Sequence, residues 1–239
     1  MQEKHRNWLL SSVEPENLID LGSKLSPVEL RRGEELHVPS DAVEFVYFPD
    51  GALLGVLSET LSGESVVTGL IGFDGALGVF EACGSRKAHM RGLVIVGGAA
   101  YRMRASDYRA LYDASPGLRT AVHKHVEVLL AETRQSVGCN AIHPVESRLA
   151  RTLLEANERC DGDNVVALTQ EALAQMLGVQ RTTVAVAMSA MQKQGILRSG
   201  RGAVELNPDA LEKTACSCRE ILQMLKIEIR TTRAESCDA

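Results

Sequence analysis

The sequence predicts an α+β protein in which an N-terminal β domain is joined by a long helix to a C-terminal winged helix-turn-helix. Three patterns lead to this prediction. From about residue 25 to residue 103, short apolar runs alternate with turns that contain glycine or proline, as in β sandwiches and barrels. Residues 116–137 contain no internal helix breaker, and residues 169–206 have the pattern of two helices followed by a β hairpin. The predicted domains are residues 1–115, 116–140 and 141–239.

The composition indicates a folded protein of two modest domains. Of the 239 residues, 45% are hydrophobic and 24% are charged, which is enough for real cores and ordinary for a soluble chain. No run approaches the roughly 20 apolar residues of a membrane span, and the first residues lack the pattern of a secretory signal. We therefore expect a cytoplasmic protein whose six cysteines are free thiols.

The N-terminal part is expected to begin with a short amphipathic helix over residues 4–21, which Pro15 divides. The turn-rich region that follows carries the alternating apolar pattern of β strands. Its candidate strands are residues 36–40, 43–48, 52–57, 65–72, 92–98 and 99–105.

A helical region follows these strands. Ser106 begins a short helix, and Ser115-Pro116 is typical of the start of the next one. This long helix carries an apolar seam with spacings of 4, 4, 3, 4 and 4 residues, which is typical of a coiled coil, although one flank must pack against the β domain. We expect the seam to meet the same helix of a second copy, in a homodimer. Its residues are Leu118, Val122, Val126, Leu129, Thr133 and Val137.

Residues 169–206 predict the winged helix-turn-helix. Thr169 can cap the first helix, and Gly178 can end it in the left-handed conformation that a sharp turn needs. The second helix, Arg181–Lys193, has a buried stripe of Val184, Ala187, Met188 and Met191, and two short strands around a glycine-bracketed loop form the wing. A hinge at Asn140 and His143-Pro144 precedes this unit, and a last helix from Asn207 follows it.

Charge supports a nucleic-acid partner for this segment. Between Ala172 and Val204 there are four basic residues and no acidic one, although the whole chain has a net charge of −5. A basic stretch in an acidic protein attracts phosphate locally. The plainer interpretation, a helical hairpin with a solvated face, remains open for the helices alone, and the two arginines of the wing favour DNA.

These residues resemble the C-terminal winged helix of the Crp/Fnr family of bacterial transcription regulators. The resemblance implies that the start of the second helix reads DNA. Arg181 matches the family's guanine-contacting arginine. Thr182 stands where many members have glutamate, and Val186 where some have a second arginine, so we expect an operator other than the best-known one of the family. The residues expected to contact DNA are Thr169, Gln170, Gln180, Arg181, Thr182, Thr183, Arg198 and Arg201.

The resemblance also implies a jelly-roll sensor of the cyclic-nucleotide-binding type before the dimerisation helix. In the family, two short sequence motifs bind the cyclic nucleotide, and the matching segments of this chain are residues 75–78 and 86–88. In these segments Ala76 replaces the glutamate that binds the ribose, and Lys87 replaces a serine. Loss of a buried acceptor for a hydroxyl costs on the order of 1–3 kcal/mol, so we predict no tight binding of cyclic AMP. The candidate pocket residues are Gly75, Ala76, Leu77, Arg86 and Lys87.

Other classes of protein are less well supported. A cupin-type metalloenzyme needs clustered histidines, but the i, i+2 pair His123 and His125 would point to different sides of a helix. No nucleophile or phosphate-loop motif is present, so neither an enzyme, a metal site nor a cofactor is predicted. Cys216-Ser217-Cys218 lies in the predicted last helix, where one buried and one exposed thiol are expected, and a thiol switch stays open.

The sequence therefore predicts a homodimeric, sequence-specific DNA-binding transcription regulator with a pseudo-palindromic operator. Double-stranded DNA and a second copy are the expected partners, and RNA polymerase and a small-molecule effector are further candidates. Two alternatives remain: a degenerate sensor module that works through protein contacts, and a regulator that responds to thiol oxidation.

Overall fold

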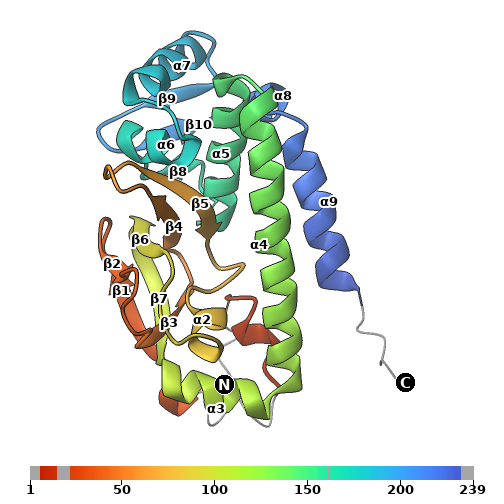
Figure 1. Ribbon diagram of the computed structural model, residues 1–239. Coiled ribbons are helices and arrows are strands. Elements are labelled where there is room, and N and C mark those ends of the chain that lie inside the picture. The colour runs from red at the N-terminus through yellow and green to blue at the C-terminus, as the bar shows by residue number, and fades with distance from the viewer. Residues whose placement is uncertain (1–5, 15–21, 161, 233–239) are drawn as a thin grey trace.

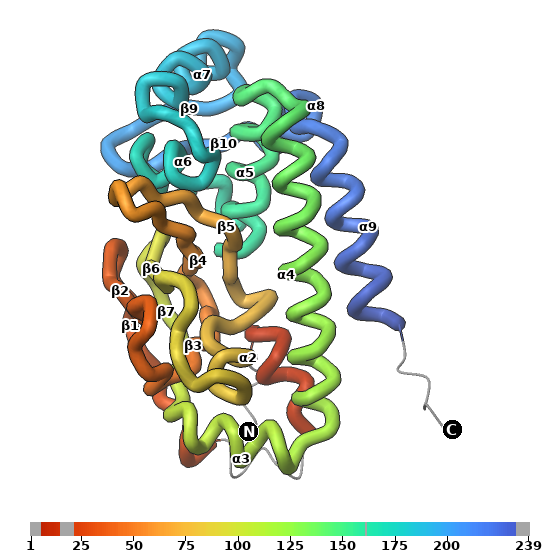
Figure 2. The backbone as a smooth tube through the Cα atoms, viewed as in Figure 1, coloured from red at the N-terminus to blue at the C-terminus, as the bar shows by residue number. Residues whose placement is uncertain are grey.

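A computed structural model describes residues 6–14, 22–160 and 162–232 of the chain (Figure 1). A β domain, a long helix beside it and a small mixed domain at one end make up the molecule. The long helix α4 (Pro116–Ile142) runs along the side of the β domain toward the small domain, and α9 (Cys218–Thr231) lies beside it (Figure 2). No helix in these ranges has both the length and the apolar character that crossing a membrane requires.

The β domain consists of two antiparallel sheets, as the alternating runs predict. One sheet has the strand order β1-β7-β3 and the other β2-β6-β4-β5, and the short helix α2 (Val79–Cys83) follows β5. The two sheets face each other across apolar side chains such as Phe48 and Leu54, which are fully buried. The strands are β1 (Ser26–Leu30), β2 (Glu35–His37), β3 (Phe45–Pro49), β4 (Leu53–Glu59), β5 (Ser65–Ile71), β6 (Arg91–Val96) and β7 (Gly98–Arg104).

The helix predicted over residues 4–21 is wrong for residues 6–14, where the structure has one 3-10 turn, η1 (Leu10–Ser12). The reason is a competing set of hydrogen bonds from Asn7. Its amide donates to the carbonyls of Pro49 at 2.9 Å and Gly75 at 2.8 Å, which fastens the segment to the β domain while Leu9 is fully buried. Pro15 and the rest of residues 15–21 lie outside the described residues.

Helices α3 (Ala105–Ala114) and α4 form at the predicted places. Ser115 caps α4, because its Oγ accepts from the backbone N–H of Leu118 at 3.1 Å and Pro116 occupies the first turn. The assignment of the whole apolar seam to a second copy does not hold. Leu118 and Val122 are 0% and 3% exposed and belong to the core of the β domain, because the first half of α4 lies against α3 and the sheet.

The C-terminal domain has the predicted winged helix-turn-helix topology. A break at His143-Pro144 separates α4 from α5, as predicted for the hinge. A three-stranded antiparallel sheet of order β8-β10-β9 forms the wing and its base. The elements are α5 (Val145–Arg159), β8 (Val165–Val166), α6 (Gln170–Leu177), α7 (Arg181–Lys193), β9 (Leu197–Ser199), β10 (Val204–Leu206) and α8 (Pro208–Thr214).

The predicted last helix is in fact two helices, α8 and α9, which are separated by residues 215–217. The chain turns there because α8 packs on α5 whereas α9 packs on α4. Cys216 lies in this link and Cys218 begins α9. Both thiols are buried, at 6% and 2% exposure, so the expectation of one buried and one exposed thiol is wrong. The five cysteines within the described ranges form no disulfide with one another, and Cys237 lies outside those ranges.

One hydrophobic core joins the two domains. Leu57 of β4 and Val67 of β5 belong to the same buried cluster as Leu173 of α6, Val184 of α7 and Leu153 of α5. The side chain of Gln175 in α6 also donates to Ser65 Oγ at 3.1 Å. The winged helix is thus packed directly on strands β4 and β5 and is not connected to the β domain through the hinge alone.

A buried ion-pair network reinforces this junction. The Nε of Arg159, at the end of α5, lies 3.1 Å from Asp74 in the β domain, and its Nη2 pairs with Glu132 of α4. Lys226 and Arg230 of α9 pair with the same two carboxylates. Burial raises the pKa of Asp74, but the charges of these cations outweigh it and hold the pKa well below its usual range.

Candidate nucleic-acid interface and sensor pocket

The turn between α6 and α7 is built as the sequence predicts. Thr169 Oγ1 accepts from the backbone N–H of Ala172 at 3.1 Å, which satisfies one of the free N–H groups at the start of α6. Gly178 ends the helix at a φ of 62°, a conformation that glycine adopts without steric cost. The short turn sets the angle at which α7 leaves the domain.

The second helix, α7, presents its N-terminal end to solvent. Its inner face is buried: Val184, Ala187, Met188 and Met191 are at most 3% exposed and join the core. Gln180 precedes the helix without capping it through its side chain, so the first N–H groups of α7 remain able to meet an anion. The outer face holds the exposed residues Gln180, Arg181, Thr182, Thr183, Val186 and Ser189.

The wing lies beside this end of α7. Arg198 has 83% of its side chain exposed and lies 4.0 Å from Glu205 on the neighbouring strand, and Arg201 is exposed in the loop between the strands. Gln192 of α7 holds the wing, because its Oε1 accepts from the backbone N–H of Ser199 at 3.2 Å. The wing arginines therefore lie to one side of α7.

A groove of about 380 Å³ runs between the start of α6, the start of α7 and the wing loop. The structure brings three of the predicted DNA-contacting residues to this groove, and it adds wing and helix residues that the sequence did not indicate. Its polar lining comes from Thr169, Gln170, Glu171, Arg181 and Ser199, together with the backbone of Gly200 and Gly202.

Arg181 and Gln180 also border a second groove, of about 780 Å³, whose other wall is the β4–β5 hairpin. Ser58, Thr60 and Glu64 of this hairpin face the start of α7 across it. No sequence pattern could have indicated this neighbour, since the hairpin lies more than a hundred residues earlier in the chain. Any ligand of α7 wide enough to fill this groove would contact the β domain as well.

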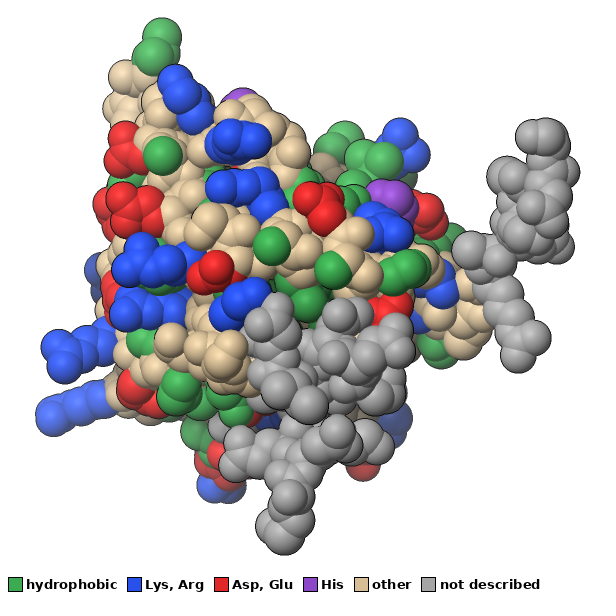
Figure 3. Space-filling model, turned by 90° about the horizontal axis from the view of Figure 1, so that it is seen from below, with side chains coloured by type: hydrophobic (Ala, Val, Ile, Leu, Met, Phe, Trp, Pro, Cys, Tyr) green, Lys and Arg blue, Asp and Glu red, His purple; other side chains and the backbone are tan. Residues whose placement is uncertain are grey.

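The charge distribution singles out the winged helix. On the β-domain end of the molecule, which Figure 3 shows from below, basic and acidic side chains are intermixed. Between Ala172 and Val204 every charged side chain is basic. In the sequence, Glu171 and Glu205 flank this segment, at the first turn of α6 and on β10, and in space Glu64 also faces the start of α7. A local positive surface is what a phosphate backbone requires.

The predicted effector residues separate into two groups. Ala76 and Leu77 line a pocket of about 280 Å³ between the β4–β5 sheet and α4, whereas Arg86 and Lys87 are exposed and lie outside its lining. Gly75 faces the buried ring of His125, which leaves no room for a ligand there. The pocket walls are mostly apolar side chains: Val56, Ile71, Leu77, Phe80, Met90, Val126, Leu129 and Leu130.

The described walls of this pocket lack two groups that the resemblance assigns to a cyclic-nucleotide site. Among the residues that the structure describes, no arginine or lysine lines it to pair with a phosphate, and Ala76 offers no side-chain acceptor to a ribose. The carboxyl that the described residues place in its wall is that of Glu81, which is 8% exposed and whose Oε2 has no hydrogen-bond partner. Burial raises the pKa of Glu81 above its ordinary value.

The two histidines considered as metal ligands lie apart, as their spacing predicted. His123 is exposed and interacts with the Tyr112 hydroxyl at 3.2 Å. His125 is buried and its Nε2 lies 3.2 Å from the carbonyl oxygen of Ala76. Each has its own local partner, so the pair does not form a chelating site.

The second half of the predicted dimer seam is accessible. Val126 is 38% exposed, Val137 is 69% exposed and Thr133 is also exposed, whereas Leu129 is only partly exposed and packs on the core of the β domain. Leu130 and Ile142 add to the apolar surface of α4, at 46% and 76% exposure. The outer side of α9 is apolar as well, with Ile221, Met224 and Ile227 exposed.

Comparisons with known proteins agree with this arrangement. Residues 147–214 match the family model of the Crp-like helix-turn-helix domain, and no curated protein matches the chain. Among solved structures, FixK2 from Bradyrhizobium japonicum is similar, with 17% identity and a TM-score of 0.68 over 80% of this chain and 98% of that one. A CRP/FNR-family transcriptional regulator from Thermus thermophilus is 20% identical, with a TM-score of 0.63 over 80% and 98% of the two chains.

A third similar structure is CLP, described as a c-di-GMP-responsive global regulator of Xanthomonas campestris. It is 16% identical, with a TM-score of 0.63 over 81% of this chain and 99% of that one. These structures span both the β domain and the winged helix, whereas the family model covers the winged helix alone. The chain therefore has the fold of these regulators, and its residues 147–214 are similar to the Crp-like helix-turn-helix domain.

Proposed function

We propose that the protein is a cytoplasmic, sequence-specific DNA-binding transcription regulator that acts as a homodimer. The observation that supports this most directly is the exposed N-terminal end of α7, where Arg181 stands over a buried apolar stripe and beside the arginines of the wing. A helix presented in this way enters the major groove of DNA with its first residues toward the base edges.

The side chains have separable roles in this proposal. Arg181 reads a base, most simply guanine, through two parallel hydrogen bonds, and Gln180, Thr182 and Thr183 supply further contacts to bases or phosphates. Thr169 and Gln170 at the start of α6, and Arg198 and Arg201 in the wing, hold the phosphate backbone. Backbone contacts fix the register of the protein on DNA, whereas base contacts select the sequence.

The dimer is proposed to form along the exposed side of α4. Val126, Leu130 and Val137 present an apolar surface to solvent, and the exposed apolar residues of α9 extend this kind of surface to the neighbouring helix. Pairing two copies about a two-fold axis would bury it and would place two recognition helices in successive major grooves. The operator should then be a pseudo-palindrome with half-sites about 34–36 Å apart.

The β domain is proposed to be a sensor that does not take cyclic AMP. Its pocket is lined mostly by apolar side chains, its described walls contain no arginine or lysine, and position 76, where the resemblance places a glutamate, is alanine. A mainly apolar effector that shares a hydrogen bond with Glu81 suits these walls better. Isothermal calorimetry with cyclic AMP should show no binding in the micromolar range, and measurable heat at that concentration would contradict this part of the proposal.

The experiment that tests the function is a selection of random DNA duplexes by the purified protein at physiological salt. A two-fold symmetric consensus is the expected result, and Arg181→Ala should blur one position in each half-site. Recovery of no consensus, with or without cell extract, would contradict a sequence-specific regulator. It would favour a module that works through contacts with other proteins.

A further inference from the structure

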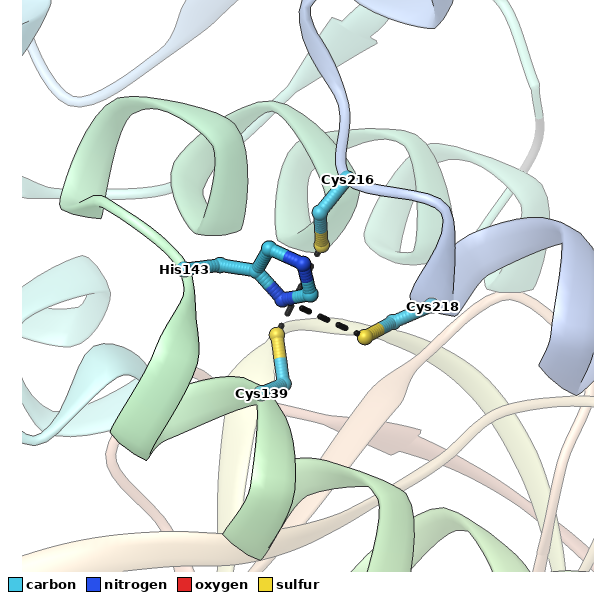
Figure 4. A group of neighbouring side chains, drawn as sticks. All are labelled: Cys139, His143, Cys216 and Cys218. Carbon is cyan, nitrogen blue, oxygen red and sulfur yellow. Dashed lines mark hydrogen bonds between the residues drawn. The ribbon is translucent and has the colours of Figure 1, made fainter.

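Three cysteines and one histidine meet where α4 ends and α9 begins (Figure 4). Cys139 and His143 come from the end of α4 and the hinge, and Cys216 and Cys218 come from the α8–α9 link and the start of α9. Their four potential ligand atoms all lie within 4.8 Å of one another. We call this group the hinge cluster.

The chain folds these four side chains together for simple reasons. Residues 139 and 143 are four apart in the sequence, so they lie on the same side of a helix one turn apart. Two residues at i and i+2 would diverge on a helix, but Cys216 precedes α9 and Ser217 is its N-cap, so both thiols can face α4. The packing of α9 along α4 then closes the group.

The separations match one tetrahedral metal ion. The Sγ atoms of Cys139 and Cys216 are 3.5 Å apart, and Cys218 Sγ lies 3.5 Å from His143 Nδ1. Bonds of about 2.3 Å to sulfur and 2.0–2.1 Å to nitrogen place two sulfurs about 3.8 Å apart and sulfur and nitrogen about 3.6 Å apart around a tetrahedral Zn²⁺ ion. These two separations differ from the tetrahedral values by a few tenths of an ångström. The other ligand atoms also lie within 4.8 Å of one another, so movements of about 1 Å or less would bring all four to the ion.

The ligand set and its burial select the kind of metal. Thiolate and imidazole ligands suit zinc and exclude magnesium and calcium, which prefer oxygen. An iron–sulfur cluster needs its protein ligands spread around a core of several atoms, which is wider than this group allows. Cys139, Cys216 and Cys218 are at most 6% exposed, so the site is closed to water, as in structural rather than catalytic zinc sites.

Neighbouring groups suit a site with three thiolates. Gln135 Nε2 donates to Cys218 Sγ at 3.1 Å, which orients that ligand. The guanidinium of Arg151, on α5, interacts electrostatically with Cys139 and Cys216. Arg151 also pairs with Glu155 at 3.0 Å, so its positive charge offsets only part of the single negative charge that remains when Zn²⁺ is bound by three thiolates and a neutral imidazole.

We propose that the hinge cluster binds one Zn²⁺ ion, which fastens the end of α4 to the start of α9. The ion would cross-link the helix that leads into the hinge to the last helix of the chain, and it would withdraw three thiols from oxidation. This site is distinct from the DNA-contacting surface and from the sensor pocket, so the proposal stands or falls independently of the proposed function.

The first test uses the full-length wild-type protein, produced in zinc-containing medium and purified without chelator under reducing conditions. Elemental analysis should find one zinc per chain. Replacement of zinc by Co²⁺ should give the visible absorption of tetrahedral cobalt together with thiolate-to-cobalt charge-transfer bands. Protein that takes up neither metal, or a cobalt spectrum without thiolate bands, would overturn the proposal.

Variants then identify the ligands. Cys216→Ser and His143→Ala should lower the zinc affinity, measured against a competing chelator, by about 100-fold or more. His143→Cys should restore it because a thiolate replaces the imidazole, and the exposed Cys83→Ser is the matched control that should bind like wild type. Unchanged affinity in Cys216→Ser would overturn the assignment. The wild-type cobalt spectrum decides the question even where a variant fails to fold.

Discussion

Arg159 is the side chain at which the β domain, α4 and α5 meet, and its replacement by methionine should destabilise the protein strongly. Its side chain is 6% exposed and forms ion pairs with Asp74 and Glu132, whose side chains are 13% and 12% exposed. Methionine keeps the apolar stem and the contact with Gly72 but removes the charged head and every side-chain hydrogen bond. Both carboxylates would remain buried with fewer partners.

The magnitude follows from what remains around these carboxylates. Removing one partner of a buried pair costs about 3–5 kcal/mol. Here Glu132 keeps Lys226 at 2.5 Å, and Asp74 keeps Arg230 at 3.7 Å, so we expect the lower end of that range, about 3 kcal/mol. For a chain of this size, this corresponds to a decrease in Tm of about 6–12 °C.

The assay is denaturant and thermal unfolding at pH 7, at one protein concentration because dimerisation changes apparent stability. The matched control is Arg91→Met. Arg91 also pairs with two carboxylates, Glu35 and Glu59, but its side chain is 30% exposed, so the loss should stay below about 1 kcal/mol. Adding Asp74→Asn and Glu132→Gln to Arg159→Met should recover part of the lost stability, because the buried charges are removed while Lys226 and Arg230 lose a partner each. Equal losses in Arg159→Met and Arg91→Met, or no recovery in the triple variant, would refute this reasoning.

Three further predictions concern the winged helix and the ion pairs of Arg159. Thr169→Ala removes the cap of α6 and should cost about 1 kcal/mol in the free energy of unfolding, and a loss no larger than that of the exposed Thr182→Ala would contradict the capping role. On the selected operator, Arg181→Ala should cost about 1–3 kcal/mol of binding at one base position, whereas Arg201→Ala should weaken all sequences alike; equal effects on every sequence would argue against base reading by Arg181. The ion pairs of Asp74 and Glu132 also make stability depend on pH. Burial alone would raise the pKa of both carboxyls, but the neighbouring cations hold it below the ordinary values of 3.8 and 4.5. The contribution of these pairs to stability is therefore complete above about pH 5 and is lost as the pH falls below those ordinary values. Urea midpoints between pH 7 and pH 3 should fall more steeply for wild type than for Arg159→Met, and parallel curves would contradict this.

The winged helix could be predicted from the sequence because its determinants are local. A capping threonine at Thr169, a left-handed glycine at Gly178 and a stripe of buried residues at helical spacing all lie within a few turns of each other. The two-sheet β domain could be predicted for a similar reason, since alternating apolar residues and turn residues mark each strand. The structure of the N-terminal segment could not be predicted, because Asn7 binds carbonyls more than forty residues away.

The partner of the long helix could not be read from spacing. A seam of apolar residues looks the same whether it meets a second copy or the helix's own domain, and here Leu118 and Val122 do the latter. Val126, Thr133 and Val137 reach solvent, whereas Leu129 packs on the core of the β domain. Tertiary packing decided this, not the helical repeat.

The hinge cluster was missed because its members were considered separately. Cys216 with Cys218 is a poor chelating pair on a helix, and neither histidine near the middle of α4 helps. The informative pair was Cys139 with His143, which share one face of a helix, but Cys139 and Cys216 are 77 residues apart in the chain. Their meeting depends on α9 folding back along α4.

The single core shared by the β4–β5 sheet and the winged helix limits how this protein can be recombined. A two-domain architecture of this kind suggests building chimeras in which the β domain of one protein is joined at the hinge to the winged helix of another. In this chain such a cut would separate Leu57 and Val67 from Leu173 and Val184, exposing apolar faces that a foreign partner has not been shaped to cover. A gene fusion or an engineered chimera would have to exchange the surface of strands β4 and β5 together with the winged helix. A change of DNA sequence preference should therefore arise more readily by substitutions on α7 than by exchange of whole domains.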